Sequence, residues 1–356
     1  MDALFLGTLD GVFKVARRSG GAWRVVSQDL SGMEINALAV RPDRREVLYA
    51  GVRGGGVFRS DDAGKNWRRL GETVLSDKIR ALALDPSNAE TIYVGTEPPG
   101  LWKSEDGGKS WCELGGVGRL AKERRWTYPV PMIEPHVRSI AIDPRNPGKL
   151  CLAAQVGGVL LSSNGGVSWT DVRYPIDMDV HCVTFDPARG QVLYAATGGG
   201  ENFPEPTPPP KGRPLYRSRD GGYSWESISD SLARTYSVPV RVHPQKSEVL
   251  FLGVAEDPPP FWLKRTTRAN GALMRSDDGG NSWRQLTEGF PDPYESMVEC
   301  IDFDPAHPDH VFVGTGGEGA RYIKLEKGEV FHSADCGDHW EKLPIDFPII
   351  YAMAVQ

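Results

Sequence analysis

One eight-residue pattern recurs along the chain and constrains the fold more than any other feature of the sequence. The pattern is Ser-x-Asp-x-Gly-x-x-Trp, in which Asn164 replaces the aspartate once. Six near-complete copies lie at residues 60–67, 104–111, 162–169, 218–225, 276–283 and 333–340, and a degenerate seventh ends at Trp23. An aspartate can accept backbone N–H bonds inside a tight turn, and a glycine adopts backbone conformations closed to other residues. We therefore expect each octet to be a rigid turn whose tryptophan packs into a sheet.

Each octet lies in the same longer frame of four short strand-like runs. An alternating apolar run ends in a proline turn, a second run follows, a third enters the octet and a fourth leaves it; one such set is 80–84, 91–96, 100–104 and 112–114. Four short strands per unit, separated by turns, are typical of one β-propeller blade. The sequence therefore predicts an all-β fold in which residues 1–356 form a single seven-bladed β-propeller with four-stranded antiparallel blades.

The two ends of the sequence supply complementary parts of one blade. The N-terminal runs 3–8, 11–15 and 23–27 match second, third and fourth strands, and residues 349–356 match a first strand. We expect the C-terminal strand to close blade one, because closure removes exposed sheet edges. Deleting residues 349–356 should then destabilise the whole ring.

The repeat resembles that of the Asp-box (BNR) propellers, and the resemblance covers essentially the whole chain. That superfamily includes sialidases, xyloglucan-cleaving glycosidases, the sortilin ectodomain and photosystem II assembly factors. It implies the fold and leaves the function open. The Arg-Ile-Pro triplet of sialidases is missing, the xyloglucan-cleaving enzymes use two facing propellers, and no catalytic residue of either carries over.

The loops are expected to sort onto two faces, because strand direction alternates within a blade. The octets and proline turns share one face, and the insertions at 115–136, 197–214, 254–272 and 315–329 fall on the other. Long loops on a rigid scaffold are where function usually lies, and the resemblance implies a ligand on the face opposite the octets. We predict the functional site at the axial channel mouth on that face, beside the loops of blades four to seven.

Polar residues open the innermost strands at this mouth. Aligned by the proline turns, the ring consists of Asn36, Arg80, Arg138, His181, Val238, Glu299 and Tyr351. Glu299 and Asp179 are candidate catalytic carboxylates because strands would hold them rigidly, with His181 and His136 as acid–base partners. The other interpretation is a water-filled polar mouth, which every propeller has.

Further residues are candidates for holding a substrate. Arg53, Arg80 and Arg138 come from consecutive blades and would form an anion clamp. Trp126 and Trp262 lie in insertions beside basic residues, which suits a sugar or an anionic planar ligand; alternatively, each ring pins its own loop. The remaining candidates are Tyr351 and Glu201, and the other loop carboxylates are Glu97, Glu256, Asp257 and Glu318.

A metal site is a further candidate. His136 and His181 begin adjacent inner strands, and Asp179, Glu201 or Glu299 would complete a set for zinc or another divalent metal. No spacing motif such as His-Glu-x-x-His supports it. A divalent metal is therefore the one cofactor that the sequence suggests.

Two functions remain open. The first is a hydrolase or lyase that acts at the mouth on a small polar or anionic substrate, including carbohydrate. The second is a non-catalytic scaffold that binds a protein through loops 197–214 and 254–272, of which the first is rich in proline and therefore stiff. A net charge of −6 argues against nucleic acid, and no apolar run approaches the roughly 20 residues that span a membrane. Five irregularly spaced cysteines and an N-terminus unlike a signal peptide predict a cytoplasmic protein with Cys151 and Cys182 as buried thiols.

Overall fold

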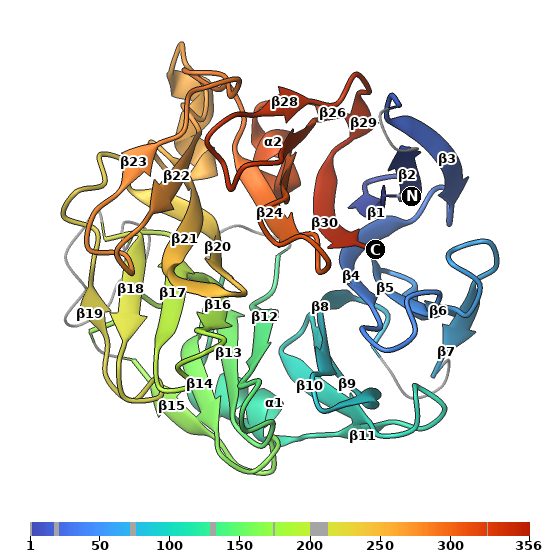
Figure 1. Ribbon diagram of the computed structural model, residues 1–356. Coiled ribbons are helices and arrows are strands. Elements are labelled where there is room, and N and C mark those ends of the chain that lie inside the picture. The colour runs from blue at the N-terminus through green and yellow to red at the C-terminus, as the bar shows by residue number, and fades with distance from the viewer. Residues whose placement is uncertain are drawn as a thin grey trace.

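The chain forms a ring of sheets around a central axis (Figure 1). The computed structural model describes residues 2–17, 21–71, 76–128, 133–173, 175–199, 213–325 and 327–356. Their strands build seven four-stranded antiparallel sheets and one separate two-stranded sheet. The predicted seven-bladed propeller is confirmed.

The blades follow one another in sequence order, each with its innermost strand beside the axis. Blade 1 consists of β30 (Ile350–Val355), β1 (Asp2–Thr8), β2 (Gly11–Arg17) and β3 (Arg24–Asp29). Blade 2 consists of β4 (Glu34–Val40), β5 (Leu48–Arg53), β6 (Gly56–Ser60) and β7 (Arg68–Leu70). Blade 3 consists of β8 (Ile79–Asp85), β9 (Asn88–Thr96), β10 (Gly100–Ser104) and β11 (Cys112–Glu113). Blade 4 consists of β12 (His136–Ile142), β13 (Leu150–Gln155), β14 (Gly158–Ser162) and β15 (Thr170–Val172).

The remaining blades repeat this order. Blade 5 consists of β16 (Val180–Phe185), β17 (Leu193–Thr197), β18 (Leu215–Ser218) and β19 (Glu226–Ser227). Blade 6 consists of β20 (Tyr236–His243), β21 (Lys246–Ala255), β22 (Ala272–Ser276) and β23 (Arg284–Gln285). Blade 7 consists of β24 (Val298–Phe303), β25 (Val311–Thr315), β27 (Val330–Ser333) and β28 (Glu341–Lys342). The small extra sheet pairs β26 (Lys327–Gly328) with β29 (Phe347–Pro348).

The C-terminal strand closes the ring as the sequence predicts. Strand β30 pairs antiparallel with β1, from Leu4 opposite Val355 to Gly7 opposite Ala352. Ile350 is fully buried. The first and last strands thus share one sheet, and each closes an edge that the other would leave open.

The octets are hydrogen-bonded turns, and residues 104–111 show the arrangement. Asp106 Oδ1 accepts the backbone N–H groups of Lys109 and Ser110, each at 2.9 Å. The Ser104 hydroxyl accepts the Gly108 N–H at 2.8 Å, and Trp111 Nε1 donates to the Gly108 carbonyl at 3.1 Å. The aspartate therefore organises the turn from within, and its role is structural.

These turn aspartates make the stability of the protein depend on pH. Hydrogen bonds from the side chain and backbone four residues on lower the pKa of Asp62, Asp106 and Asp278 from 3.8 to about 2. A carboxyl with a lowered folded-state pKa stabilises the fold above its unfolded pKa, near 4, and loses that contribution as the pH falls towards 2. We expect the urea midpoint of unfolding to fall over this interval.

Asn164 provides the matched control for that prediction. It accepts the Ser168 N–H at 3.0 Å in its own octet without a titrating group. Asp106→Asn should therefore keep the turn and reduce the slope of the urea midpoint against pH between about 4 and 2. An unchanged slope in a triple Asp→Asn variant of positions 62, 106 and 278 would contradict the assignment.

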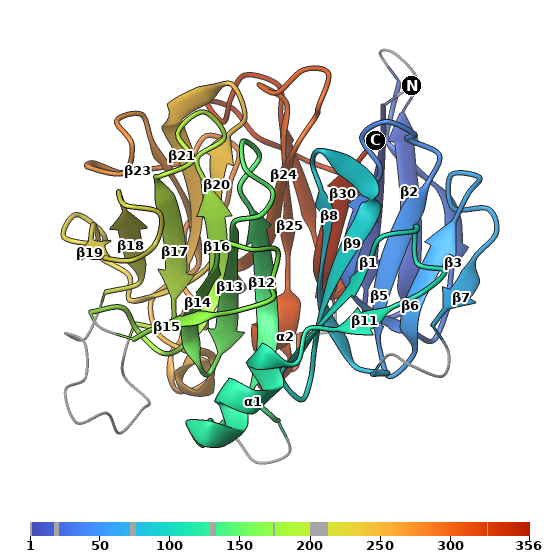
Figure 2. The ribbon, with the colours of Figure 1, turned by 90° about the horizontal axis from the view of Figure 1, so that it is seen from below.

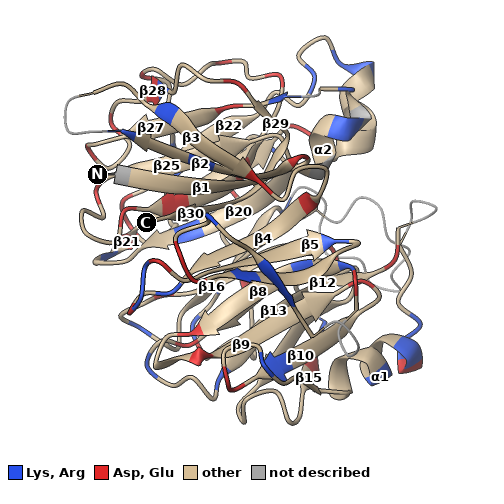
Figure 3. Cartoon of the chain, turned by 90° about the vertical axis from the view of Figure 1, so that its right-hand side faces the viewer, with Lys and Arg blue, Asp and Glu red and all other residues tan. Residues whose placement is uncertain are grey.

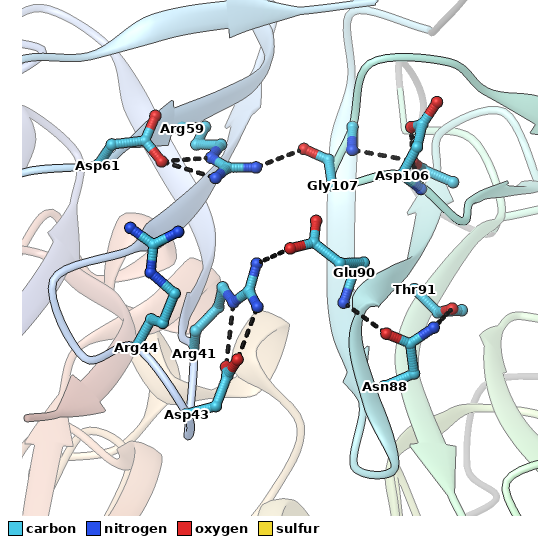
Figure 4. Close-up of polar contacts among 12 residues, drawn as sticks. Arg41, Asp43, Arg44, Arg59, Asp61, Asn88, Glu90, Thr91, Asp106 and Gly107 are labelled. Atoms are coloured by element: carbon cyan, nitrogen blue, oxygen red, sulfur yellow. Dashed lines mark hydrogen bonds and ion pairs between the residues drawn. The ribbon is translucent and has the colours of Figure 1, made fainter.

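Arginines on the third strands of blades 2, 5 and 6 each join the octet of the following blade. Arg59 Nη1 donates to the Gly107 carbonyl of the next octet at 2.9 Å (Figure 4). Arg217 makes the same bond to Gly279 at 2.8 Å. The octet turns therefore also link neighbouring blades on their own face.

The insertions lie at the opposite end of the ring, as predicted. They contribute α1 (Gly116–Glu123), the 3-10 helix η1 (Pro259–Lys264) and α2 (Gly317–Tyr322). Figure 2 places α1 and α2 at one end and the C-terminus at the other. In Figure 3 the same two helices lie towards the right, and part of the α1 ribbon is blue, which marks its basic residues. The described helices of three insertions therefore lie at the end of the ring that is predicted to carry function, and residues 200–212 of the remaining insertion lie outside the described residues.

A β-bulge interrupts every innermost strand at the same level. The register shifts between Ile35 and Ala37 in β4, and the corresponding shift recurs in each of the other blades. The residues left without a ladder partner are Asn36, Arg80, Arg138, His181, Val238 with Pro239, Glu299 and Tyr351. Bulges re-aim side chains, and here they turn the whole predicted ring towards the axis.

Candidate functional site

The bulge residues converge on one axial cavity of about 540 Å³. Its lining includes the complete predicted ring and continues down the inner strands to the proline turns at Pro42 and Pro86. A cavity of this volume is large enough for a small-molecule ligand. We call its end opposite the octets the mouth.

One side of the mouth is a histidine–arginine contact between blades 3 and 4. His136 is buried, and its Nδ1 lies 2.9 Å from the Glu134 carbonyl, so Nδ1 carries the proton. Its Nε2 then accepts a hydrogen bond from Arg80 Nη2 at 3.0 Å. Arg80 Nη1 also donates to Asn36 Oδ1 at 3.4 Å. This side of the mouth is held by a neutral imidazole and a guanidinium.

A buried glutamate neutralises the cations beneath this contact. Glu97 is 0% exposed. Its Oε2 lies 3.4 Å from Arg80 Nε and 3.5 Å from Arg53 Nη2, and its Oε1 lies 3.2 Å from Lys78 Nζ. Arg53 also lies 3.7 Å from Glu34. Three cations thus share one internal carboxylate.

Glu299 faces blade 4 across the mouth. Its Oε1 lies 3.1 Å from Arg138 Nη2, and Arg138 Nη1 donates to Gln155 Oε1 at 2.7 Å. A Cβ added at Gly317, whose φ is +63°, would lie 1.8 Å from Glu299 Oε2. Gly317 therefore leaves the space that the carboxylate occupies.

Asp179 and His181 lie side by side on blade 5 and form another contact between charged or titratable side chains at the mouth. His181 Nδ1 lies 2.5 Å from the Ser237 carbonyl and so carries a proton. Its Nε2 lies 3.2 Å from Asp179 Oδ1, which is ion-pair distance without hydrogen-bond alignment. A Cβ at Gly198 would lie 2.2 Å from Asp179 Oδ2. As at Glu299, a glycine makes room for the carboxylate.

Tyr236 of blade 6 lies against His181 and is near enough to Asp179 and Glu299 to be affected by their charges. Its ring centroid is 4.8 Å from that of His181. Burial raises the pKa of Tyr236 well above its usual value, and its hydroxyl feels the charges of Arg138, Asp179 and Glu299. Blades 5, 6, 7 and 4 thus bring two carboxylates, an imidazole, a neutral phenol and a guanidinium to one region.

The structure corrects the expected anion clamp. Arg53 and Arg80 are engaged by Glu97, and Arg138 is engaged by Glu299. A ligand anion would have to displace an internal carboxylate. The three arginines shape and orient the mouth, and they do not form an open anion site.

The two insertion tryptophans differ in exposure. Trp262 is 0% exposed, packs against Tyr236 and Met297, and donates from Nε1 to the Asp257 carbonyl at 2.6 Å. Of the two interpretations of Trp262, its burial supports the one in which the ring anchors its own loop, and not the one in which it contacts a substrate. Trp126 is half-buried over Gly157, where a Cβ would lie 2.7 Å from the indole. Glu201 lies outside the residues that the structure describes.

Tyr351 joins the mouth from the closing strand. It is 7% exposed, and the Arg321 guanidinium of α2 lies 5.5 Å above its ring. Arg321 Nη2 also lies 2.7 Å from Glu34 of blade 2. The helix α2 therefore covers the seam where the chain closes.

The geometry does not fit a metal at His136 and His181. His136 Nε2 already accepts a hydrogen bond from the Arg80 guanidinium, which would repel a divalent cation. Both Nδ1 atoms face backbone carbonyls. The predicted metal is therefore not supported by these donors.

A different ligand-like group, His243, Asp309 and Cys336, lies on the octet face within the described chain. His243 Nδ1 accepts the N–H groups of Gln245 and Lys246, each at 3.1 Å. Its Nε2 must then carry the proton that points to Asp309 Oδ1 at 3.2 Å. A neutral histidine cannot also bind a metal through the protonated Nε2. We therefore assign this group a structural role, in which its hydrogen bonds stabilise the turn at residues 243–246.

Three residues of the site were missed by the sequence prediction. Gln155 orients Arg138, and Gly198 and Gly317 accommodate the two carboxylates. Glu97 was among the predicted loop carboxylates, but its role as the internal counterion was not predicted. The sequence does contain a pattern from which these two glycines could have been predicted. The second strands of blades 5 and 7 both end in a threonine that is followed by two glycines, and in the other blades they do not.

Fold and mouth together define a single seven-bladed β-propeller with a polar axial site. No model of a protein family matches the chain. A curated relative, the oligoxyloglucan-reducing end-specific xyloglucanase of Emericella nidulans, is 26% identical over 171 residues, which is 46% of this chain and 17% of that protein. The chain thus spans less than a fifth of that relative.

Solved structures of two kinds share the fold. The GH74 xyloglucanase of Xanthomonas campestris has a TM-score of 0.64 at 18% identity, covering 86% of this chain and 45% of its own. YCF48 of Cyanidioschyzon merolae has a TM-score of 0.57 at 15% identity, covering 91% and 88%. YCF48 bound to a D1 peptide has a TM-score of 0.54 at 14% identity, covering 86% and 81%. At these identities the likeness concerns the fold.

The part of the chain that the structure describes contains no helix long and apolar enough to cross a membrane.

Proposed function

We propose that this protein is a hydrolase or lyase that acts on a small polar ligand, most favourably a carbohydrate, at the axial mouth. The observation that carries the proposal is that Glu299, paired with Arg138, and His181, beside Asp179, both line the axial cavity. Two carboxylates around a polar cavity are the minimum for glycosidic hydrolysis. The similar xyloglucanases support carbohydrate as the ligand class.

The roles follow from the contacts. The ion pair with Arg138 fixes the Glu299 carboxylate, which suits it to act as base or nucleophile. Asp179 and His181 form the opposite proton-transfer pair, with the imidazole oriented by the Ser237 carbonyl. Because Glu97 neutralises Arg53 and Arg80, we expect neutral sugars to be preferred over acidic ones.

A panel of neutral and acidic oligosaccharides and small esters tests the proposal. Glu299→Gln should lower turnover of the best substrate by roughly 10²–10⁴-fold, because it removes a positioned acid–base group. The control is Glu105→Gln on the octet face, where Glu105 pairs with Lys103 and its side chain is 72% exposed. Its turnover should match the wild type. Equal turnover by both variants, or neither turnover nor calorimetric binding of any panel member by the wild type, would refute the proposal.

A scaffold function is the second candidate, and loop 254–272 favours it. Buried Trp262 fixes the loop, while Leu263 on η1 is 56% exposed beside Lys264 and Arg265. Arg265 pairs with Glu256 and Asp257 of the same loop. A rigid loop that presents an apolar side chain beside Lys264 suits a protein partner. The YCF48 structure with a bound peptide supports this alternative. Pull-down with wild type and Leu263→Ser, with substrate turnover measured in parallel, separates the two functions.

A further inference from the structure

A second ring of inner-strand residues lies below the mouth, and five of its seven members line the cavity. The residues share one register position, opposite an aromatic residue or Cys151 on the second strand. They are Ala39, Ala83, Ala141, Thr184, Arg241, Asp302 and Ala354. Five of the seven are small and uncharged, and the two charged members come from the adjacent blades 6 and 7. We call this set the inner ring.

Arg241 uses only one of its three guanidinium nitrogens on the protein. Nη1 donates to Cys182 Sγ and to the Val240 carbonyl, each at 3.1 Å. Within the described chain, Nε and Nη2 make no hydrogen bond to protein, and no carboxylate lies at ion-pair distance. Arg80 and Arg138, the other arginines that line the cavity, both have carboxylate partners.

The two unused nitrogens form one edge of the guanidinium. Nε–H and one Nη2–H point in parallel, which is the geometry that matches the two oxygens of a carboxylate. Arg241 lines the axial cavity and keeps part of its surface accessible. Arg241 thus brings two nitrogens without a protein partner among the described residues to a cavity of about 540 Å³, which is large enough for a small molecule.

The surroundings limit the charge and shape of the occupant. Burial raises the pKa of Asp302, against the opposing effects of the Val355 N–H and Arg241. Arg241 supplies one positive charge, and Asp302 beside it would repel additional negative charge. The site therefore suits a ligand with one negative charge better than a ligand with two. The methyl groups of Ala39, Ala83 and Ala354 offer an apolar wall to the rest of the ligand.

We propose that the inner ring is a binding site for the carboxylate group of a small organic acid, held bidentately by Arg241. The site is distinct from the catalytic residues proposed above and does not rest on them. A ligand reaches it through the axial cavity, which is continuous from the mouth ring to the inner ring.

Calorimetry and thermal unfolding with acetate, propionate and 4-bromobenzoate, against sodium chloride and phosphate at equal ionic strength, test the site. Carboxylates should bind the wild type and raise its Tm above the value in chloride or phosphate. Arg241→Met should weaken carboxylate binding by roughly tenfold or more, because two charge-assisted hydrogen bonds are lost. Arg44→Met should not change it, since Arg44 is half-exposed and pairs with Glu46.

Two further measurements keep the test decisive if Arg241→Met does not fold. Arg241→Lys retains the positive charge but removes the two parallel N–H donors of the guanidinium. This variant should therefore also bind carboxylate more weakly than the wild type. In wild-type crystals soaked with 4-bromobenzoate, the bromine anomalous peak should lie in the axial cavity near the inner ring. Equal stabilisation by chloride or phosphate, unchanged affinity in a folded Arg241 variant, or a bromine peak only elsewhere would overturn the proposal. Loss of turnover in Glu299→Gln with intact carboxylate binding would leave it standing.

Discussion

Removing residues 349–356 should leave a chain that does not form the native ring. The deletion takes out the innermost strand of blade 1, including the buried side chains of Ile350, Met353 and Val355. Burial of one such side chain contributes about 1.5–3 kcal/mol, and the ladder to β1 is lost with them. Since whole proteins are stable by only about 5–15 kcal/mol, we expect loss of the cooperative unfolding transition and aggregation on expression.

A shorter deletion provides the control. Removing Gln356 alone eliminates its side-chain bond to the Arg45 carbonyl and its backbone bond to Ala3, and leaves β30 intact. This variant should unfold cooperatively close to the wild type. If the longer deletion kept the circular dichroism spectrum and urea midpoint of the full chain, the closing role of β30 would be wrong.

Replacing Glu97 by glutamine should be the most destabilising single substitution at the mouth. The change leaves Arg53, Lys78 and Arg80 around a neutral group that is fully buried. Breaking a buried ion pair from one side costs about 3–5 kcal/mol, because the remaining charge stays desolvated. We expect a lower urea midpoint at an unchanged m-value, together with weaker ligand binding at the mouth.

Glu226→Gln is the matched control for Glu97→Gln. Glu226 also pairs with two arginines, Arg217 at 2.8 Å and Arg219 at 3.0 Å, but its side chain is 51% exposed. Solvent screens such pairs, so the loss should be about 1 kcal/mol or less. Equal urea midpoints for the two variants would show that Glu97 is not the counterion on which the mouth depends.

The fold could be predicted from the sequence because its signals repeat. Six octets and a degenerate seventh in one register fix the blade count and the position of each strand, and an unmatched first strand at 349–356 identifies the closure. The same alignment by proline turns placed Arg138 and Glu299 at one mouth, where the structure brings them to 3.1 Å.

The internal pairing at the site could not be predicted in the same way. Glu97 meets Arg53 and Arg80 across two blades, and no local pattern specifies which cation a carboxylate faces. The burial of Trp262 depends on how an insertion without a repeat folds back against Tyr236 and Met297. Periodicity carries information only where the chain is periodic.

The bulge shared by all seven innermost strands separates the binding specificity of this architecture from its stability. Each of the seven ring positions at the mouth is a bulge position without a ladder partner. This position accepts different side chains without a change in the surrounding strands. In this one molecule it is occupied by asparagine, arginine, histidine, valine, glutamate and tyrosine. Point substitutions can therefore give the opening a new chemistry without rebuilding the blades, and propellers that superimpose closely are free to recognise unrelated molecules.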